Sequence, residues 1–246
     1  MIPPLIVLAV LIGGWELICQ AGWVDPLLLP APSAVATSLW EDRAILGPDL
    51  AVTTQEVVFG LLAALVLGIV LAVAMHLVPM LDRALRPLVV GSQAVPIPVL
   101  APLIVFALGF GLAPKIVVVA LICFFPVVVN VADGLRDVDP DARRVLNALG
   151  TSRWQRLRFL EAPSALPAGF TGLRIAAAVA VIGAVLAETA GSTAGLGHLI
   201  ITANAQLASA RVFAATALLV FEAVALYVLF SALERRVVSW SPRTVS

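Results

Sequence analysis

The sequence predicts an all-α integral membrane protein with six transmembrane helices, both termini in the cytoplasm, and a short helix-turn-helix loop between the fourth and fifth spans. Of its 246 residues, 61% are hydrophobic and 12% are charged, whereas soluble domains are about half apolar and about a quarter charged. Several apolar runs have the roughly 20 residues that a helix needs to cross a bilayer. Basic residues gather on one set of connections, which indicates an orientation. This length suffices for one compact bundle, so residues 1–246 are expected to form a single transmembrane domain.

Six segments have the length and polarity of spans, and they cover residues 5–19, 57–78, 88–108, 116–132, 166–187 and 212–233. The first is short, although an apolar stretch at 23–29 could extend or flank it. The chain starts without a basic region or a small-residue cleavage site, which favours a retained first span over a removable signal peptide. No soluble domain is expected before that span. The Pro-rich, acidic stretch at 25–49 is predicted to be an external loop.

The basic residues are divided unequally between the two sides of this topology. With both termini inside, only Arg43, Lys115 and Arg211 fall outside, and twelve arginines fall on the cytoplasmic side. Because cytoplasmic flanks of spans accumulate positive charge, the reverse orientation is disfavoured. The cytoplasmic set comprises Arg83, Arg86, Arg136, Arg143, Arg144, Arg153, Arg156, Arg158, Arg174, Arg235, Arg236 and Arg243. Formal net charge is zero, so bulk charge does not point to nucleic acid or to an acidic partner.

The third span is interrupted by three prolines, Pro96, Pro98 and Pro102. Each proline removes a backbone donor, and such breaks survive in membranes where neighbouring helices or a wet cavity satisfy the freed groups. We therefore expect a broken, interior helix, with Gln93, Pro96 and Pro98 as candidate pathway or gate residues. A kink needed only for packing is the alternative. Pro126 and Asn130 give the fourth span a milder version of the same signal, and Asn130 is a further candidate pathway or gate residue.

The connection between the fourth and fifth spans, at about 133–165, is predicted to hold two short helices. Asp139 is a suitable N-cap and Gly150 a suitable C-terminal glycine, which predicts a helix over 141–149. Ser152 and Gln155 have capping-box spacing and predict a second segment over 153–161. The prolines at 163 and 167 are expected to end that segment before the membrane.

The first of these helices has a small apolar face. Its members are Ala142, Val145, Leu146 and Leu149, whereas Arg143, Arg144 and Asn147 lie on or beside the opposite face. So small a face needs a second surface, and three remain open: the anionic inner leaflet, the protein's own bundle, or a groove in a partner protein. DNA binding is disfavoured because the loop is tethered to lipid at both ends.

The run from Asp141 to Pro167, followed by Gly172-Leu173-Arg174 and ending at Glu188, resembles the EAA loop and following span of binding-protein-dependent ABC importer permeases. The resemblance covers nearly the whole chain and is closest to the nitrate, sulfonate and taurine branch. Its further members are Gly60, Gly68, Leu81-Asp82-Arg83 with Pro87, Ala94-Val95-Pro96 leading to Pro102-Leu103-Ile104 and Phe106, Phe125-Pro126, Asn130, Gly134-Leu135 and Gly195-Leu196-Gly197.

One departure concerns the loop itself. Counting back from Gly150, the positions where that family carries Glu-Ala-Ala hold Arg144, Val145 and Leu146. The role usually assigned to the glutamate therefore does not transfer to this chain.

The resemblance implies a subunit of a bacterial inner-membrane importer. Its expected partners are a second permease chain, as a homodimer, two cytoplasmic ATP-binding subunits that hold ATP and Mg, and an extracytoplasmic solute-binding protein. The branch handles small anions, sulfonates and pyrimidine precursors of vitamins. The resemblance also implies that the first loop helix sits in a cleft of the ATPase. The residues expected at this coupling contact are Arg143, Arg144, Val145, Leu146, Leu149, Gly150, Thr151, Arg153 and Trp154.

No motif for ATP hydrolysis is present. A Walker loop needs a lysine that reaches the terminal phosphates, and the single lysine, Lys115, lies at the outer end of a span. We therefore expect a non-catalytic subunit that holds no metal or cofactor. Cys19 and Cys123 fall in apolar runs and are expected to be core residues, not a disulfide. His76 and His198 are expected to be isolated, with structural or interfacial roles.

Carboxylates within apolar spans are candidate functional residues. Glu16 and Glu222 lie deep in spans, and Glu56 and Glu188 lie nearer the ends. A proton relay through Glu222 competes with a structural role. Glu188 matches the acidic residue that ends the family's fifth span and is a candidate gate residue. The Gly-, Ser- and Thr-rich stretch at 191–197 is expected to be a re-entrant turn or a flexible loop.

A second hypothesis is an ion-coupled secondary transporter or a small channel that works without an ATPase. Such a protein has no need of a docking loop. The loop at 133–165 therefore favours the importer.

Overall fold

The computed structural model describes residues 4–240, which form helices joined by short turns, with no strand among them. An all-α fold is therefore confirmed. Arg243, one of the predicted cytoplasmic arginines, lies outside the described residues. The elements are α1 (Pro4–Gln20), α2 (Pro32–Glu41), α3 (Arg43–Leu77), α4 (Pro79–Gly91), the 3₁₀ turn η1 (Ser92–Ala94), α5 (Ile97–Leu108), α6 (Leu112–Arg136), α7 (Pro140–Ala148), α8 (Arg153–Arg156), the π-helical turn η2 (Leu157–Glu161), α9 (Ala162–Thr189), α10 (Leu196–Ala205) and α11 (Ser209–Val237).

Four of the described helices are long and apolar enough to cross a membrane. They are α3, α6, the continuous helix Arg153–Thr189 and α11. Helices α4 and α5 pass the same test only as a pair, bent by 99° at the break between them, so the described residues hold four or five spans. Helix α1 is apolar, but its 17 residues are short for a span.

The core lies between α3, α6 and α9, whose backbones approach closely through small residues. A Cβ atom on Gly68 of α3 would lie 2.7 Å from a Val127 methyl carbon of α6. One on Gly172 of α9 would lie 2.6 Å from the Pro126 carbonyl oxygen. Small residues at such crossings are what membrane helices use to pack, since lipid gives little hydrophobic drive for association. A row of fully buried alanines completes the contact surface of α9: Ala176, Ala177, Ala180, Ala184 and Ala187.

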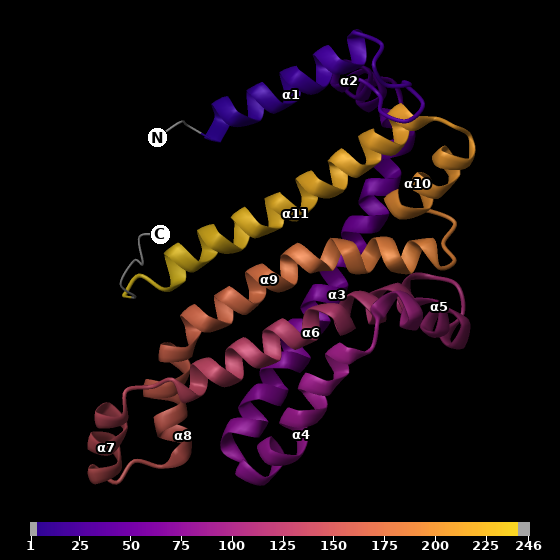
Figure 1. Cartoon of the computed structure of the whole chain (residues 1–246). Coiled ribbons are helices and arrows are strands. Elements are labelled where there is room, and N and C mark those ends of the chain that lie inside the picture. The colour runs from indigo at the N-terminus through magenta and orange to yellow at the C-terminus, as the bar shows by residue number, and fades with distance from the viewer. Residues whose placement is uncertain (1–3, 241–246) are drawn as a thin grey trace.

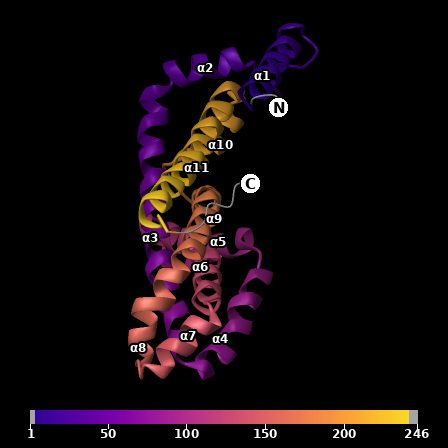
Figure 2. The same ribbon diagram turned by 90° about the vertical axis from the view of Figure 1, so that its left-hand side faces the viewer.

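Helices α1 and α2 lie at the end of the molecule opposite α7 and α8, in both views (Figures 1 and 2). Helix α1 stands apart from the bundle and packs on α2. It also brings Trp15 to 6.0 Å from the Phe213 ring of α11, measured between ring centroids. Most of its apolar side chains are exposed in the single chain.

Residues 25–49 are largely helical, so the prediction that they form a loop was wrong. It contains all of α2 and the first turns of α3. Pro32 begins α2, where its missing N–H needs no partner. Pro48 lies within the second turn of α3, again close to a helix start. These prolines were interpreted as signs of a loop, but proline is also tolerated near the start of a helix.

The second segment of the helical loop does not end at the prolines. It continues through η2 into α9 as one helix, Arg153–Thr189, with Pro163 and Pro167 inside it. The π-helical turn ends at Glu161, two residues before Pro163, and such a turn changes the hydrogen-bond register of a helix. The chain therefore accommodates both prolines without leaving the helix.

The predicted break in the third span is confirmed, but the bend is not interior in this chain. After η1, Val95 and Pro96 are extended, with ψ angles of 119° and 116°. The side chains of Gln93, Pro96 and Pro98 are exposed. Helix α5 faces its own chain through Ala101 and Val105, and no described element covers the bend.

Candidate functional sites: a helical loop and a buried polar network

Helix α7 is capped at both ends, by a side chain at its start and by backbone hydrogen bonds at its end. The Asp139 carboxylate accepts the backbone N–H of Asp141 at 2.9 Å, which caps the start of the helix. At its end, Gly150 has a φ of +73°. The N–H groups of Gly150 and Thr151 donate to the carbonyls of Asn147 and Leu146 at 3.0 and 3.2 Å, the two bonds of a Schellman motif.

A capping box begins α8 directly after this turn. The Ser152 N–H donates to the Gln155 side chain at 2.8 Å, and the Gln155 N–H donates to the Ser152 hydroxyl at 3.2 Å. The turn between α7 and α8 is thus fixed by hydrogen bonds on both sides. These bonds hold the end of α7 and the start of α8 in a defined arrangement.

The expected apolar face of α7 is split between two environments. Leu146 and Ala142 are partly covered by the chain, whereas Val145 and Leu149 are 59% and 72% exposed. Trp154 of α8 is also exposed, at 62%. These three exposed side chains define what we call the exposed apolar face of the loop. Packing of the whole face on the protein's own bundle is therefore contradicted, which leaves the membrane surface or a partner.

Two of the predicted contact residues turn toward the chain itself. The Arg143 Nε lies 3.1 Å from the Glu161 carboxylate, and an Arg153 nitrogen donates to the Leu77 carbonyl at 3.4 Å. By contrast, the Arg144 side chain is 79% exposed and pairs only with Asp141, at 2.8 Å on its own helix. Arg144 is the one of these three arginines that projects away from the bundle.

A buried ion pair joins α3 and α6 at the end of the molecule away from the loop. The Lys115 Nζ of α6 lies 2.6 Å from Oε1 of Glu56 on α3, and the Glu56 side chain is fully buried. The same ammonium donates to the Ser192 hydroxyl at 2.6 Å, in the turn after α9. Lys115 therefore joins three segments, and it is only 7% exposed although it lies in the first turn of α6.

Glu188, at the end of α9, extends this network to the start of α10. Its carboxylate accepts the Thr53 hydroxyl at 2.7 Å and the Gly197 N–H at 2.5 Å. Thr53 in turn accepts the Leu196 N–H at 2.9 Å. A Cβ on Gly197 would lie 2.8 Å from the Glu188 oxygen, so only glycine permits this approach. The stretch at 191–197 is consequently anchored to the helices and is not a flexible loop.

The predicted gate residues are not brought together. Gln93, Pro96 and Pro98 lie on the exposed bend, and the Asn130 side chain donates to the Pro126 carbonyl of its own helix at 2.7 Å. Within residues 4–240, no hydrogen bond or ion pair links them to Glu188 or to each other.

The structure also places the cysteines, His76 and two of the carboxylates. Both cysteines are free and Cys123 is buried, as expected, but Cys19 is only partly buried, so the prediction that it is a core residue was wrong. His76 is not isolated, because its Nε2 lies 2.7 Å from the Glu161 carboxylate. Glu16 lies toward the end of α1, where its carboxylate accepts the Ser33 hydroxyl at 2.7 Å. Glu222 is buried, and both of its carboxylate oxygens lack a hydrogen-bond partner among the described residues.

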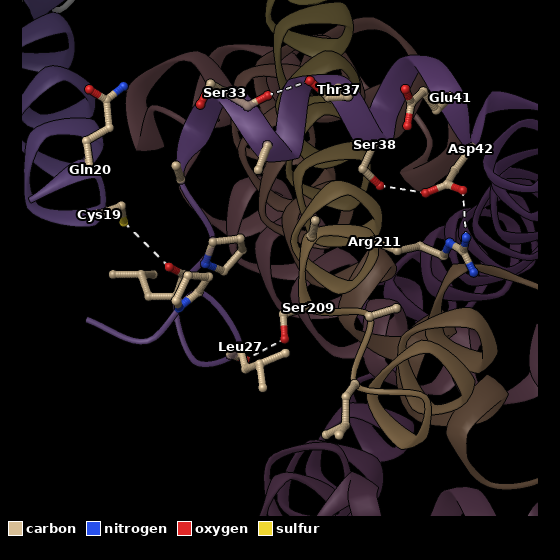
Figure 3. Close-up of a pocket in the computed structure, with 18 residues that line it drawn as sticks. Cys19, Gln20, Leu27, Ser33, Thr37, Ser38, Glu41, Asp42, Ser209 and Arg211 are labelled. Atoms are coloured by element: carbon tan, nitrogen blue, oxygen red, sulfur yellow. Dashed lines mark hydrogen bonds and ion pairs between the residues drawn. The ribbon is translucent and has the colours of Figure 1, made fainter. Parts of the chain in front are cut away.

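A cavity of about 850 Å³ lies at the α1–α2 end, between α2 and the turn that joins α10 to α11 (Figure 3). Asp42 accepts the Ser38 hydroxyl and the Arg211 guanidinium there, both at 2.7 Å. The Arg211 guanidinium lowers the pKa of Asp42 below its ordinary value. Ser209 donates to the Leu27 carbonyl across the cavity at 2.5 Å. The cavity is separate from the predicted gate residues, none of which lines it.

Sequence reasoning missed Thr53 and Ser192 and did not recognise the role of Lys115. A lone lysine in an apolar segment, in a chain that also buries carboxylates, was the available signal, because a charge in lipid is expected to be paired. The pairing itself depends on which helices are neighbours, which a single sequence does not reveal.

The chain was compared with known proteins. Residues 64–239 match the family described as the binding-protein-dependent transport system inner membrane component. A probable ABC transporter permease protein of Haemophilus influenzae is 36% identical over 92% of this chain and 93% of its own length. The riboflavin transport system permease protein of Chloroflexus aurantiacus is 33% identical, over 96% of this chain and 88% of its own. The taurine transport system permease protein of Escherichia coli is also 33% identical, over 95% and 87%.

These matches confirm the resemblance stated from the sequence, and they favour an importer over an ion-coupled transporter. They also agree with the several long apolar helices of a multi-pass inner-membrane protein. The chain belongs to the family of inner membrane components of binding-protein-dependent transport systems, the permease subunits of ABC importers.

Proposed function

We propose that this chain forms, with a second copy of itself, the translocation pathway of an importer driven by two cytoplasmic ATP-binding subunits. In this proposal α1, the α4–α5 pair, α3, α6, α9 and α11 are the six spans, and both termini are cytoplasmic. The chain itself is non-catalytic, and ATP and Mg bind to the partner ATPase. A small solute, of the size of riboflavin or taurine, is delivered by an extracytoplasmic binding protein.

The exposed apolar face of the loop carries this proposal. Val145, Leu149 and Trp154 are presented by two short helices whose ends are fixed by caps. Exposed apolar side chains on a rigid element are typical of a docking surface. Because α8 continues into α9, a displacement of this surface passes directly into a membrane-spanning helix. This continuity supports coupling of the ATPase to the pathway.

Arg144 gives the docking surface its charge. The positively charged guanidinium is mostly exposed, and its intrahelical pair with Asp141 is worth only about 0.2–0.5 kcal/mol. A cleft that receives it is expected to offer an acidic or neutral surface. A glutamate at this position is therefore expected to weaken assembly with the chain's own ATPase.

The α4–α5 bend is the proposed lining of the pathway. Irregular backbone at membrane depth is tolerated only where protein or water covers it. Since no described element covers Val95 and Pro96, a second permease chain or a water-filled pathway is the surface that they require. Gln93 places a polar side chain at the same bend.

The test is co-purification of the ATPase with Leu149→Asp permease, expressed from its native operon. We expect the ATPase to be lost, because a carboxylate replaces an apolar contact at the centre of the docking surface. Val237→Asp is the matched control, since Val237 is an exposed valine at the end of α11 and lies outside the loop. Retention of the ATPase by Leu149→Asp at wild-type levels contradicts the proposed docking surface.

A further inference from the structure

A second cavity, of about 240 Å³, lies between the end of α3 and the helical loop. It is on the side of α7 that faces the bundle, because Arg143 reaches into it while Val145 and Leu149 point outward. It is therefore distinct from the exposed apolar face of the loop. The residues that line it are His76, Leu77, Pro79, Arg143, Arg153, Arg156 and Glu161.

The cavity holds more positive than negative charge. Its single carboxylate, Glu161, is already engaged: Oε1 lies 3.1 Å from Arg143 Nε, and Oε2 lies 2.7 Å from His76 Nε2. Within the part of the chain that the structure describes, Arg153 and Arg156 form no ion pair. Arg156 donates to the Asn147 side chain at 2.5 Å and to the Thr151 carbonyl at 3.4 Å, and Arg153 donates only to the Leu77 carbonyl. Both guanidinium groups therefore lack a carboxylate partner among the described residues, and Arg153 is exposed.

We propose that this cavity binds a phosphate group, held by Arg153 and Arg156. A guanidinium carries five N–H donors in a planar fork that matches the oxygens of phosphate, and each arginine here uses only one terminal nitrogen in protein contacts. Pro79 at the rim is the first residue of α4, a 13-residue helix with no side-chain N-cap. Its first turn leaves N–H groups free to face an anion, and the one carboxylate of that turn, Asp82, is paired with Arg86 and Arg136.

The phosphate can come from a phospholipid headgroup or from free phosphate, because both present the same oxygens. The location suits a headgroup, since α3 ends at Leu77 after a long apolar run and the cavity begins there. A partner protein is a poorer fit. The space is too small for a helix, and none of Val145, Leu149 and Trp154 lines it. An acidic side chain of the ATPase is nevertheless an outcome that the experiment below detects.

The test compares the cavity variant Arg153→Gln/Arg156→Gln with the control Arg235→Gln/Arg236→Gln, which removes the same charge from an exposed pair at the end of α11. Both full-length proteins are purified in detergent, and circular dichroism verifies their helix content. Binding of phosphatidylglycerol is measured by native mass spectrometry. Binding of inorganic phosphate is measured as the shift in unfolding temperature against chloride at equal ionic strength.

We expect the cavity variant to bind at least one probe about tenfold more weakly than wild type, as the loss of charge-assisted hydrogen bonds predicts. The control should stay within about twofold. An effect on phosphatidylglycerol alone assigns the site to a lipid headgroup, and an effect on inorganic phosphate assigns it to the free ion. Equal losses in both variants, or none in either, overturn the proposal. So does a cavity variant that loses the ATPase in co-purification while binding both probes normally, because the site then serves a protein carboxylate. The proposed docking surface would survive a negative result.

Discussion

Lys115→Met removes the cation from the buried polar network and leaves the Glu56 carboxylate without its ion-pair partner. The Glu56 side chain is fully buried and lies 2.6 Å from the ammonium. Removal of one member of a buried pair costs about 3–5 kcal/mol, since the remaining charge is neither solvated nor paired. At about 2–4 °C per kcal/mol for a chain of this size, the expected fall in unfolding temperature is about 6–20 °C.

The measurement is thermal unfolding of the detergent-solubilised permease, followed by far-UV circular dichroism. The double variant Lys115→Met/Glu56→Met should regain at least half of the loss, because it removes both charges and keeps apolar volume. Arg144→Met serves as the control, and its exposed intrahelical pair should change the unfolding temperature by no more than about 2 °C. A single variant that unfolds within about 2 °C of wild type refutes the reasoning. A double variant no more stable than the single one would show that the loss comes from packing.

Three further predictions follow from the packing, the loop and the α1–α2 end. Gly172→Ala should lower the free energy of unfolding by about 1–3 kcal/mol, because the added Cβ would lie 2.6 Å from the Pro126 carbonyl oxygen and must push α6 and α9 apart. The unfolding temperature of the variant measures this loss. An unchanged unfolding temperature contradicts the close approach of the two helices. Gly150→Ala should destabilise the end of α7 by about 1 kcal/mol, because alanine is strained at the φ of +73° found there. Limited proteolysis should therefore cut the loop faster in this variant. Gly91→Ala is the control, since Gly91 has a negative φ and open space around it. Because the pKa of Asp42 is lowered in the fold, its pair with Arg211 contributes stability above the unfolded pKa and loses it as pH falls through the folded pKa. Asp42→Asn should therefore reduce the unfolding temperature at pH 7 more than at acidic pH, and a reduction independent of pH contradicts this account.

Local chemistry explains why the caps of α7 and the start of α8 were predicted correctly, whereas the end of the second segment was not. Asp139, Gly150 and the Ser152–Gln155 pair act within a few residues of themselves, so their spacing alone determines how α7 ends and α8 begins. The break near Pro96 was predictable for the same reason. The four long spans also followed from hydropathy, since lipid imposes one simple rule on helix composition.

Non-local features were predicted poorly. The 25–49 region was read as a loop because its prolines and acids were weighed without knowledge of where α2 and α3 start. The partners of Lys115 come from positions 59 and 77 residues away, and no periodicity links them. The same limit applies to the outward direction of Val145 and the inward direction of Arg143, which depend on how α7 sits against Glu161.

The 99° bend between α4 and α5 has a consequence for how the protein is made in the cell. A chain newly inserted in the bilayer exposes irregular backbone at 92–96, which hydrocarbon solvates badly. Until a second chain or a hydrated pore covers this segment, the newly made subunit carries a defect that membrane quality control can recognise. Permease made in excess of its partners should consequently be short-lived, so that proteolysis, and not synthesis alone, sets the ratio of subunits in the membrane.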